Sequence, residues 1–558
     1  MQEPSEAQVG NMLASSATGT TFLILIQLTS RIFTFGSNQL ILRTLSPMVL
    51  GIAAQLELYQ VTILYFSRES IRIAIQRQPF ITDSSESKIG KRSPQFQSTA
   101  SQSVVNVSYL SLFLGVPSTI LLTMFYQQFA PEQALMVPFF EVSVIITGIA
   151  ALLELSVEPF FAIVQQRMWY EKRAAVEMPA AFMKSFATCS AFFYASQTGR
   201  QAGILPFAIG HLAYSVTLIG GYCLSLLPRA SERPFSYLPT VIRQHNDDST
   251  YIFGRFSWRL TSLAASVFLQ SLVKHLLTQG DSMMLAAMSS LEDQGIYSLA
   301  SNYGGLIARI IFQPLEESSR NLFSTLLSPN ESGNRNAAQI SLAKSHLTDL
   351  LRAYQLLSTL IFPLGPVMVP QALRILGGRQ WTSPLVGDLL SLYCYYIPFL
   401  AFNGITEAFV SSAANPGEIR RQTVWMGAFS ASYALAAYTF LEVWSMGGYG
   451  LVLANIVNMV VRTLWSYTFI RSYLRRHGEG LSVVEVSIKP VSYLLGILAT
   501  GIMVTHRPSG PDQHLIPALV FSCFYALLIL YVERQFLIAQ VMKLRQIGSS
   551  GKKGPKSE

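Results

Sequence analysis

The chain has 558 residues, of which 50% are hydrophobic and only 13% are charged. Soluble domains carry roughly a quarter charged residues, whereas apolar stretches of about 20 residues, long enough to cross a bilayer, recur along this sequence. The composition therefore excludes a soluble enzyme. The formal net charge of +9 is attributed to basic loops beside membrane spans, not to nucleic-acid binding.

Hydropathy predicts an all-α membrane protein with about fourteen transmembrane helices. The polar start MQEPSEAQVG shows no cleavable signal peptide, so the first span is expected to direct insertion. In chain order the spans are predicted near 18–42, 49–66, 103–127, 138–163, 174–196, 203–227, 260–288, 295–319, 353–373, 385–413, 422–441, 447–470, 490–506 and 513–533. The polar connection Thr82–Ser103 is rich in Ser and Gln and is expected to be disordered.

The distribution of basic residues predicts the orientation of these spans. Most of the 40 Lys and Arg residues fall in the even-numbered connections and the C-terminal tail, which the positive-inside rule assigns to the cytosol. Both termini are therefore expected to be cytosolic. The sequons at Asn106 and Asn330 then lie on the cytosolic side, so neither should be glycosylated.

A weak internal repeat with an offset of about 244 residues indicates a duplicated helical bundle. Glu158-Pro159-Phe160 matches Glu407-Ala408-Phe409, and Gln27 and Arg31 match Gln270 and Lys274. The repeat predicts two pseudo-symmetric six-helix lobes around a central cavity, followed by two C-terminal helices. The expected divisions are an N-terminal lobe at 1–230, a cytosolic linker at 231–258, a C-terminal lobe at 259–475, the last two spans at 476–537 and a basic cytosolic tail at 538–558.

Ionisable residues inside the spans are the candidates for a binding site, because charge at bilayer depth costs several kcal/mol unless it faces water or a partner. Arg31 and Lys274 occupy matching positions in the first helix of each lobe, and two cations across a cavity suit a diphosphate. The alternative is that Arg31 pairs with Glu57 and Lys274 with Asp281. Further predicted residues for the headgroup are Arg309 and Arg462, and those for sugar hydroxyls are Gln27, Gln270, Asn302, Asn403 and Asn455.

Three carboxylates, Glu57, Glu158 and Glu407, are candidates either for proton coupling or for bracing a helix through an ion pair. Arg68, Glu69 and Arg72, at the end of the second span, are interpreted as side chains that snorkel to the headgroups. The four cysteines, all within spans, are interpreted as packing residues. The sequence contains no Walker lysine motif, no HExxH and no Cys/His cluster, so neither a metal nor another cofactor is expected.

Long stretches of the sequence resemble the Rft family of endoplasmic reticulum proteins. They are SRIFTFGSNQLILRTLSP (30–47), LGIAAQLELYQVTILYFSRESIRIAIQR (50–77), FQPLEESSRNLFS (312–324) and YYIPFLAFNGITEAFVSSAANP (395–416). The resemblance covers most of the chain. It implies the fold of the multidrug/oligosaccharidyl-lipid/polysaccharide flippase superfamily, with fourteen helices in two lobes. The family-motif residues carried over are Arg68, Glu69, Arg72, Glu316, Glu317 and Arg320.

The resemblance also implies a function. The family is linked to moving Man5GlcNAc2-diphosphodolichol from the cytosolic to the lumenal leaflet of the endoplasmic reticulum for N-glycosylation, and the expected partners are this lipid, the bilayer and other proteins of the pathway. A monomeric transporter that is not an enzyme is expected. The first alternative is a non-transporting scaffold or accessory factor that binds the same lipid. A cation-coupled drug antiporter is the third interpretation.

Overall fold

The structure is a computed structural model that describes residues 36, 39, 41, 45–76, 94–167, 169–229, 235–242, 251–307, 311–327, 337–377, 381, 383–505, 515–540 and 542. The chain forms two compact units, Met1–Ala286 and Ala287–Glu558. Each unit is a bundle of long helices, and they are described separately.

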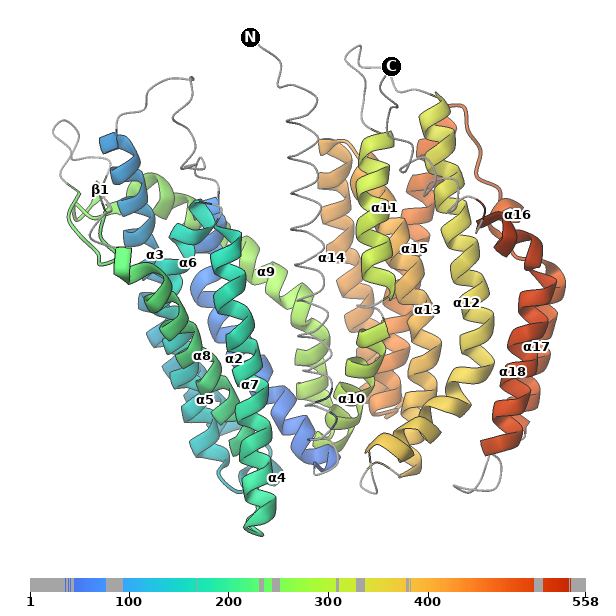
Figure 1. Ribbon diagram of the computed structural model, residues 1–558, viewed down its shortest axis with the longest axis horizontal. Helices are drawn as coiled ribbons and strands as arrows, with labels where there is room; N and C mark the ends of the chain where they lie inside the picture. The colour runs from blue at the N-terminus through green and yellow to red at the C-terminus, as the bar shows by residue number, and fades with distance from the viewer. Residues whose placement is uncertain are drawn as a thin grey trace, which may run out of the picture. The chain divides into compact units, whose positions relative to one another are not determined.

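The N-terminal unit is built mainly from long helices that run side by side (Figure 1). Its elements are α2 (Pro47–Gln76), α3 (Pro94–Phe129), α4 (Glu132–Leu135), α5 (Phe140–Leu155), α6 (Glu158–Gln166), α7 (Tyr170–Gln197), α8 (Leu205–Leu226), the 3-10 turn Leu227–Arg229, β1 (Tyr251–Ile252), β2 (Phe256–Ser257) and α9 (Trp258–Met288), whose last residues pass into the second unit. β1 and β2 form an antiparallel hairpin in which Tyr251 faces Ser257.

Small residues allow close helix contacts in this unit. α7 packs along α8, and a Cβ added at Gly210 of α8 would lie 2.0 Å from the Thr188 hydroxyl oxygen of α7. A Cβ at Gly221, further along α8, would lie 2.7 Å from a methyl group of Val176. Small residues that let backbones approach are a main source of helix association in lipid, where the hydrophobic effect between helices is weak.

The first turns of α3 hold the segment that precedes the hairpin. The Asn106 side chain is buried; its Nδ2 donates to the carbonyl oxygens of Thr240 (2.7 Å) and Arg255 (2.8 Å), and its Oδ1 accepts from the Thr240 backbone N–H. Gln102 likewise bonds the backbone of Ser236 and Leu238. The prediction of disorder over Thr82–Ser103 is thus wrong from Pro94 onward, because these polar side chains bond to backbone groups and make a helix with buried partners.

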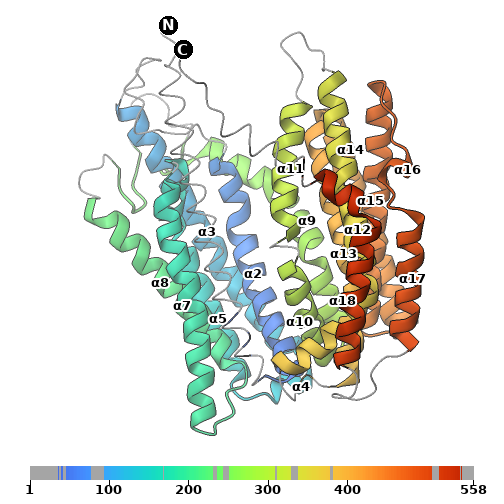
Figure 2. The ribbon, with the colours of Figure 1, turned by 45° about the vertical axis from the view of Figure 1, so that its right-hand side comes forward.

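The C-terminal unit is a second bundle of long helices (Figure 2). Its elements are α10 (Leu291–Ile307), α11 (Gln313–Leu326), α12 (Ala337–Gly377), α13 (Pro384–Ala413), α14 (Pro416–Tyr438), the π-helical turn Thr439–Val443, α15 (Gly448–Arg476), α16 (Val483–Val486), α17 (Pro490–Thr505) and α18 (Leu515–Val532). α13 packs against α10, α11, α12 and α15, whereas α17 and α18 pack on α12 and on each other. An Asn415 capping box starts α14.

Seven helices among the described residues are long and apolar enough to cross a membrane, and α18 with the short helix Arg534–Gln540 would make an eighth. These seven coincide with predicted spans near 49–66, 103–127, 138–163, 203–227, 353–373, 385–413 and 422–441. Large exposed apolar side chains, such as Phe113, Leu224 and Ile497, lie on these bundles, as lipid-facing surfaces require. The chain is thus a multi-pass membrane protein, and the count of about fourteen stays a prediction.

The predicted span 295–319 is helical wherever the structure describes it. It covers most of α10 (Leu291–Ile307) and the start of α11 (Gln313–Leu326), and Ile311 and Phe312 before α11 are π-helical. Residues 308–310 lie outside the described residues, so a single continuous helix stays a prediction. α12 begins at Ala337, well before the predicted 353, because the amphipathic first turns bury Ile340 and Leu347.

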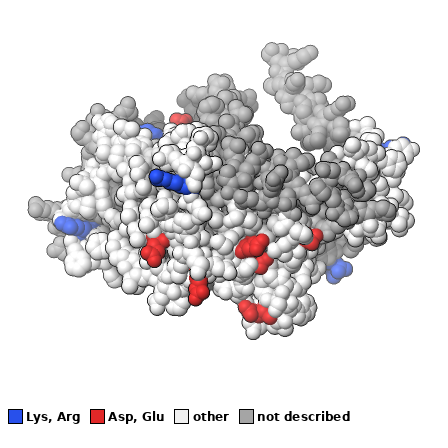
Figure 3. Space-filling model, turned by 90° about the horizontal axis from the view of Figure 1, so that it is seen from below, with Lys and Arg blue, Asp and Glu red and all other residues white. Residues whose placement is uncertain are grey.

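Most of the described surface visible in Figure 3 is uncharged, and both the Lys or Arg and the Asp or Glu side chains on it are scattered singly or in small groups.

Candidate functional site

A cluster of four charged side chains lies in the N-terminal unit between α2 and the α5–α6 pair; we call Arg68, Arg72, Glu154 and Glu158 the ion-pair cluster. Arg68 Nη1 donates to Glu154 Oε1 at 2.7 Å and reaches Glu158 Oε1 at 3.4 Å. Arg72 holds Glu158 with two bonds, from Nε (2.9 Å) and from Nη2 (2.5 Å). This two-point geometry is the strongest form of arginine–carboxylate pairing.

Helical spacing on both sides brings the cluster together. Arg68 and Arg72 are four residues apart on α2, so they share one face. α5 ends at Leu155 and α6 begins at Glu158, with Pro159 at its first turn. Pro159 cannot donate a backbone hydrogen bond, and the break places the Glu158 carboxylate at the positive end of α6.

The two partners of each pair differ in exposure. The carboxylates are nearly enclosed, with 7% of the Glu154 side chain and 4% of the Glu158 side chain exposed, whereas 20% of Arg68 and 23% of Arg72 remain accessible. Phe161 covers the Arg72 guanidinium at 3.8 Å from the ring centre. The cluster is neutral as a whole, and its arginines are the part that an anion can reach. Their prediction as side chains that only snorkel is corrected, because both form ion pairs.

The C-terminal unit contains a related arrangement around Glu407 of α13, the residue that matches Glu158 in the repeat. Arg462 of α15 donates to Glu407 Oε2 at 2.8 Å, and Asn403 Nδ2 reaches the same oxygen at 3.3 Å. Among the described residues, the buried Asn403 Oδ1 has no hydrogen-bond partner. Both ion-paired side chains are about one-quarter exposed, Arg462 at 25% and Glu407 at 29%.

The family-motif residues of α11 lie beside this pair. Arg320 Nη2 donates to Glu316 Oε1 at 2.6 Å, and a Cβ at Gly404 of α13 would lie 2.7 Å from Glu316 Oε2. The absence of a side chain at Gly404 therefore lets the Glu316 carboxylate approach α13. Glu317 is exposed and accepts from Gln313 Nε2 at 3.0 Å.

Other predicted residues lie apart from these clusters. Glu57 pairs with Lys184 of α7 at 3.7 Å, Asn455 donates from Nδ2 to the Tyr297 hydroxyl at 3.0 Å, Asn302 is exposed and Glu69 is half-buried. Asn455 is thus held within its own unit. Gln27, Arg31 and Arg309 fall outside the described residues, as do the side chains of Gln270, Lys274 and Asp281, so the predicted diphosphate pair stays a prediction.

Two members of the N-terminal site were not predicted as functional residues. Glu154 lies four residues before Glu158, on the other side of the break between α5 and α6, and this spacing was a signal that could have identified the acidic pair. Gln60 of α2, which reaches Glu154 Oε2 at 3.5 Å, carries no such signal, because a single glutamine in an apolar span has no spacing to compare.

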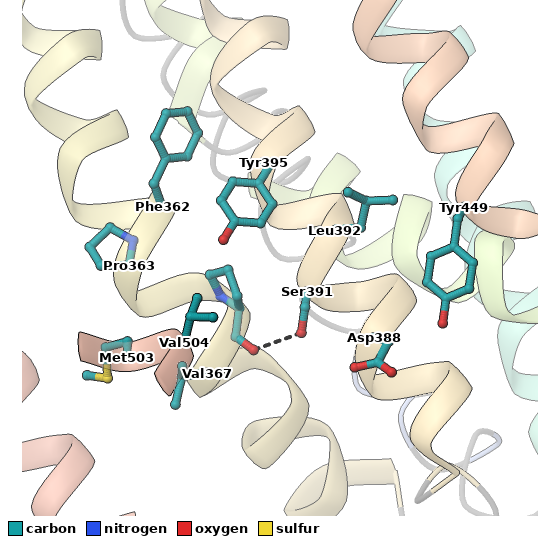
Figure 4. A pocket seen from close by; sticks show the side chains of 11 residues that line it. Phe362, Pro363, Val367, Asp388, Ser391, Leu392, Tyr395, Tyr449, Met503 and Val504 are labelled. Atoms are coloured by element: carbon teal, nitrogen blue, oxygen red, sulfur yellow. Dashed lines mark hydrogen bonds between the residues drawn. The ribbon is translucent and has the colours of Figure 1, made fainter. Parts of the chain in front are cut away.

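A cavity of about 280 Å³ opens in the C-terminal unit between α12, α13 and α17, with Tyr449 of α15 beside it (Figure 4). Its lining is largely apolar and includes Phe362, Tyr395 and Met503, with the Asp388 carboxylate as a charged group. Ser391 donates to the Pro366 carbonyl oxygen at 2.8 Å at the wall. Of the predicted site residues that the structure describes, none lines this cavity.

Two solved structures of membrane transporters have a similar fold. The "Lipid II flippase MurJ, inward closed conformation" aligns with a TM-score of 0.57 at 12% identity, covering 93% of this chain and 100% of that one. The "inward-facing conformation of a multidrug resistance MATE family transporter of the MOP superfamily" gives 0.54 at 14% identity, covering 79% and 95%. At these identities the likeness shows the fold alone.

Sequence comparison shows the family. The "Man(5)GlcNAc(2)-PP-dolichol translocation protein RFT1" of Yarrowia lipolytica is 33% identical over 519 residues, which is 88% of this chain and 74% of the relative. The Saccharomyces cerevisiae protein of the same name is 33% identical over 500 residues, 85% of each chain. Residues 15–543 match the family model described as Rft protein, and the chain therefore belongs to the Rft family, as its sequence motifs predicted.

Proposed function

We propose that this protein moves the lipid-linked oligosaccharide Man5GlcNAc2-diphosphodolichol from the cytosolic to the lumenal leaflet of the endoplasmic reticulum, for N-glycosylation. The names of its relatives in two yeasts support the substrate. The fold shared with a lipid II flippase supports movement of a lipid between leaflets as the mode of action. A transporter without catalytic chemistry fits this role.

The observation that carries the proposal is that Glu158 and Glu407, at matching positions of the repeat, are each paired with an arginine. In each unit a carboxylate at a matching position of the repeat holds an accessible arginine, Arg72 in one and Arg462 in the other. Sugar hydroxyls and diphosphate lose water in lipid only at high cost, unless polar groups replace it. Arginines held ready by carboxylates supply such groups, and a diphosphate that displaces the carboxylate takes over the charge-assisted bonds.

In the full proposal, the headgroup crosses while the polyprenyl chain stays in lipid. Arg31 and Lys274 bind the diphosphate, with Arg309 and Arg462 as further cationic contacts. The amides of Gln27, Gln270, Asn302, Asn403 and Asn455 bind the glycan, and the unbonded Oδ1 of Asn403 supports this assignment. The sequence repeat supports two six-helix lobes with a shared cavity, with 231–258 as linker and two further helices before the basic tail.

We also propose fourteen spans with both termini in the cytosol. Within the N-terminal unit, the connection that contains α4 carries Glu132 and no Lys or Arg, whereas the connection from α6 to α7 contains Arg167 and continues into the first turn of α7 with Lys172 and Arg173. The positive-inside rule assigns the second connection to the cytosol.

The decisive experiment measures transfer of the lipid-linked glycan between leaflets by the purified full-length protein in vesicles. We expect transfer by the wild type, loss of transfer in Arg31→Ala/Lys274→Ala, and no loss in the control Arg200→Ala, an exposed arginine in a connection. Unchanged transfer in the double variant would refute the diphosphate assignment. Wild-type protein that binds the lipid and never moves it would establish the scaffold role instead.

A further inference from the structure

The cavity between α12, α13 and α17 lies where helices of the C-terminal unit begin or end. Asp388 is five residues into α13, Tyr449 is the second residue of α15, and Val504 is the last but one residue of α17. α13 is long and apolar enough to span a membrane, so its first turns lie near the lipid headgroups. The cavity is therefore within reach of the headgroup layer.

Prolines in α12 remove hydrogen-bond donors on the side of the cavity, because proline has no N–H. The prolines are Pro363, Pro366 and Pro370, and the carbonyl groups four residues before them belong to Thr359, Phe362 and Pro366. Other helices supply two replacement donors: the Tyr525 hydroxyl bonds the Thr359 carbonyl oxygen at 2.7 Å, and Ser391 Oγ bonds that of Pro366 at 2.8 Å. The third carbonyl belongs to Phe362, a residue of the cavity lining, where a ligand can act as the donor.

The other polar groups of the lining also favour a hydrogen-bond donor. The ionised Asp388 carboxylate only accepts, and the Ser391 proton is directed at backbone carbonyl oxygens. Figure 4 shows the rings of Phe362 and Tyr395 at one side of the cavity, with centres 5.5 Å apart, and Tyr449 at another. Aromatic ring faces attract cations. The lining therefore suits a positively charged donor, and a primary ammonium group offers three N–H bonds.

The size and surroundings of the cavity limit what carries this ammonium group. A volume of about 280 Å³ is at the lower end of small-molecule sites, which span roughly 300–1,000 Å³, so an oligosaccharide is too large. The outer surface of α17 is apolar, with Ile497 70%, Leu498 53% and Val504 58% exposed. Val504 also lines the cavity, which joins the polar site to a surface suited to an apolar chain.

We propose that this cavity binds a primary ammonium group on an apolar chain, with the ammonium beside Asp388 and the chain on α17. Two sources have this chemistry, the ethanolamine headgroup of a phospholipid and a free amphiphilic amine. The inference does not depend on the transported substrate, because the cavity is too small to hold an oligosaccharide.

The test measures binding of radiolabelled octylamine to the purified full-length protein in phosphatidylcholine nanodiscs by equilibrium dialysis, with uptake by empty nanodiscs subtracted. Octylamine is protonated at pH 7, and 1-octanol is the matched ligand with the same chain and no charge. Asp388→Asn removes the charge, and Val504→Trp places a large ring in the lining at an exposed position. The controls, Glu442→Gln and Val491→Trp, change exposed residues of the same unit that do not line the cavity.

We expect saturable binding of octylamine, at least about tenfold tighter than binding of octanol. Asp388→Asn should weaken octylamine binding by about 10–100-fold, the range expected for loss of a hydrogen bond to a charged group. Val504→Trp should also weaken it, and both controls should bind like the wild type.

Nanodiscs that contain phosphatidylethanolamine distinguish the two sources without changing the surface charge. Octylamine binding that is weaker in these discs than in phosphatidylcholine alone shows competition and assigns the site to the lipid headgroup. Equal binding in the two kinds of disc assigns the site to a free amine, and both results keep the ammonium assignment.

Three results would overturn the proposal. Octylamine that shows no saturable binding, or that binds no more tightly than octanol, would remove the requirement for an ammonium group. Unchanged octylamine binding in Asp388→Asn and Val504→Trp would place the bound amine outside this cavity. A loss in Glu442→Gln and Val491→Trp as large as that in the cavity variants would have the same meaning.

Discussion

Replacing Glu158 by glutamine tests whether the ion-pair cluster holds the N-terminal unit together. The substitution keeps the size of the side chain but removes the charge that accepts both bonds from Arg72. Removal of one partner from a buried ion pair costs about 3–5 kcal/mol, because the other charge is left unpaired. Arg72 is 23% exposed and keeps its contact with Phe161, so solvent relieves part of this cost.

We therefore expect Glu158→Gln to lower the free energy of unfolding by about 2–3 kcal/mol, below the fully buried case. The measurement is unfolding of the detergent-solubilised full-length protein, followed by tryptophan fluorescence. Glu141→Gln is the matched control, because Glu141 is an exposed glutamate at the start of α5; its effect should stay within about 0.5 kcal/mol.

The double variant Glu158→Gln/Arg72→Gln decides whether the effect belongs to the pair. When both charges are removed together, no unpaired charge remains. The double variant should therefore lose about 1–3 kcal/mol less unfolding free energy than the two single variants lose in sum. Strictly additive losses, or a Glu158→Gln protein as stable as the wild type, would refute the pairing as a source of stability.

Three further substitutions test other contacts. Asn106→Ala removes both amide bonds to Thr240 and Arg255, so limited proteolysis should cleave the 231–258 segment faster than in the wild type; an unchanged rate would contradict the clamp. Gly210→Val places side-chain atoms against Thr188, and this overpacking should lower the free energy of unfolding by about 1–3 kcal/mol, measured as a lower thermal midpoint. Gly220→Val, which has open space around it, should leave the thermal midpoint unchanged. Glu533→Gln leaves Arg352 with a weaker acceptor. We therefore expect the free energy of unfolding to fall by about 1–3 kcal/mol, and equal melting curves of variant and wild type would contradict this.

The sequence predicted the helical membrane fold and the family, because both depend on long patterns. Runs of apolar residues of membrane length recur whatever their partners are, and seven of the predicted spans are present as helices. The prediction was wrong where contacts of individual polar side chains determine the secondary structure. The Ser/Gln-rich stretch before residue 103 forms a helix from Pro94.

The candidate site was predicted in part. Glu158 and Glu407 were identified because carboxylates are costly in an apolar span, and each has an arginine partner. The partners themselves were not predicted. Arg72 lies 86 positions before Glu158 in the chain, and hydropathy alone contains no information on which helices pack together. Arg72 was therefore interpreted from its neighbours on α2 and assigned to the headgroups.

The buried amide of Asn106 has a consequence for quality control of the chain. Asn106-Val107-Ser108 is an acceptor sequence for an N-linked glycan, yet in the folded protein every polar atom of that amide is engaged and the side chain has no contact with solvent. A sugar can be attached there only to a chain that has not folded. A mass shift at this single asparagine would thus report failed biogenesis, without any assay of activity.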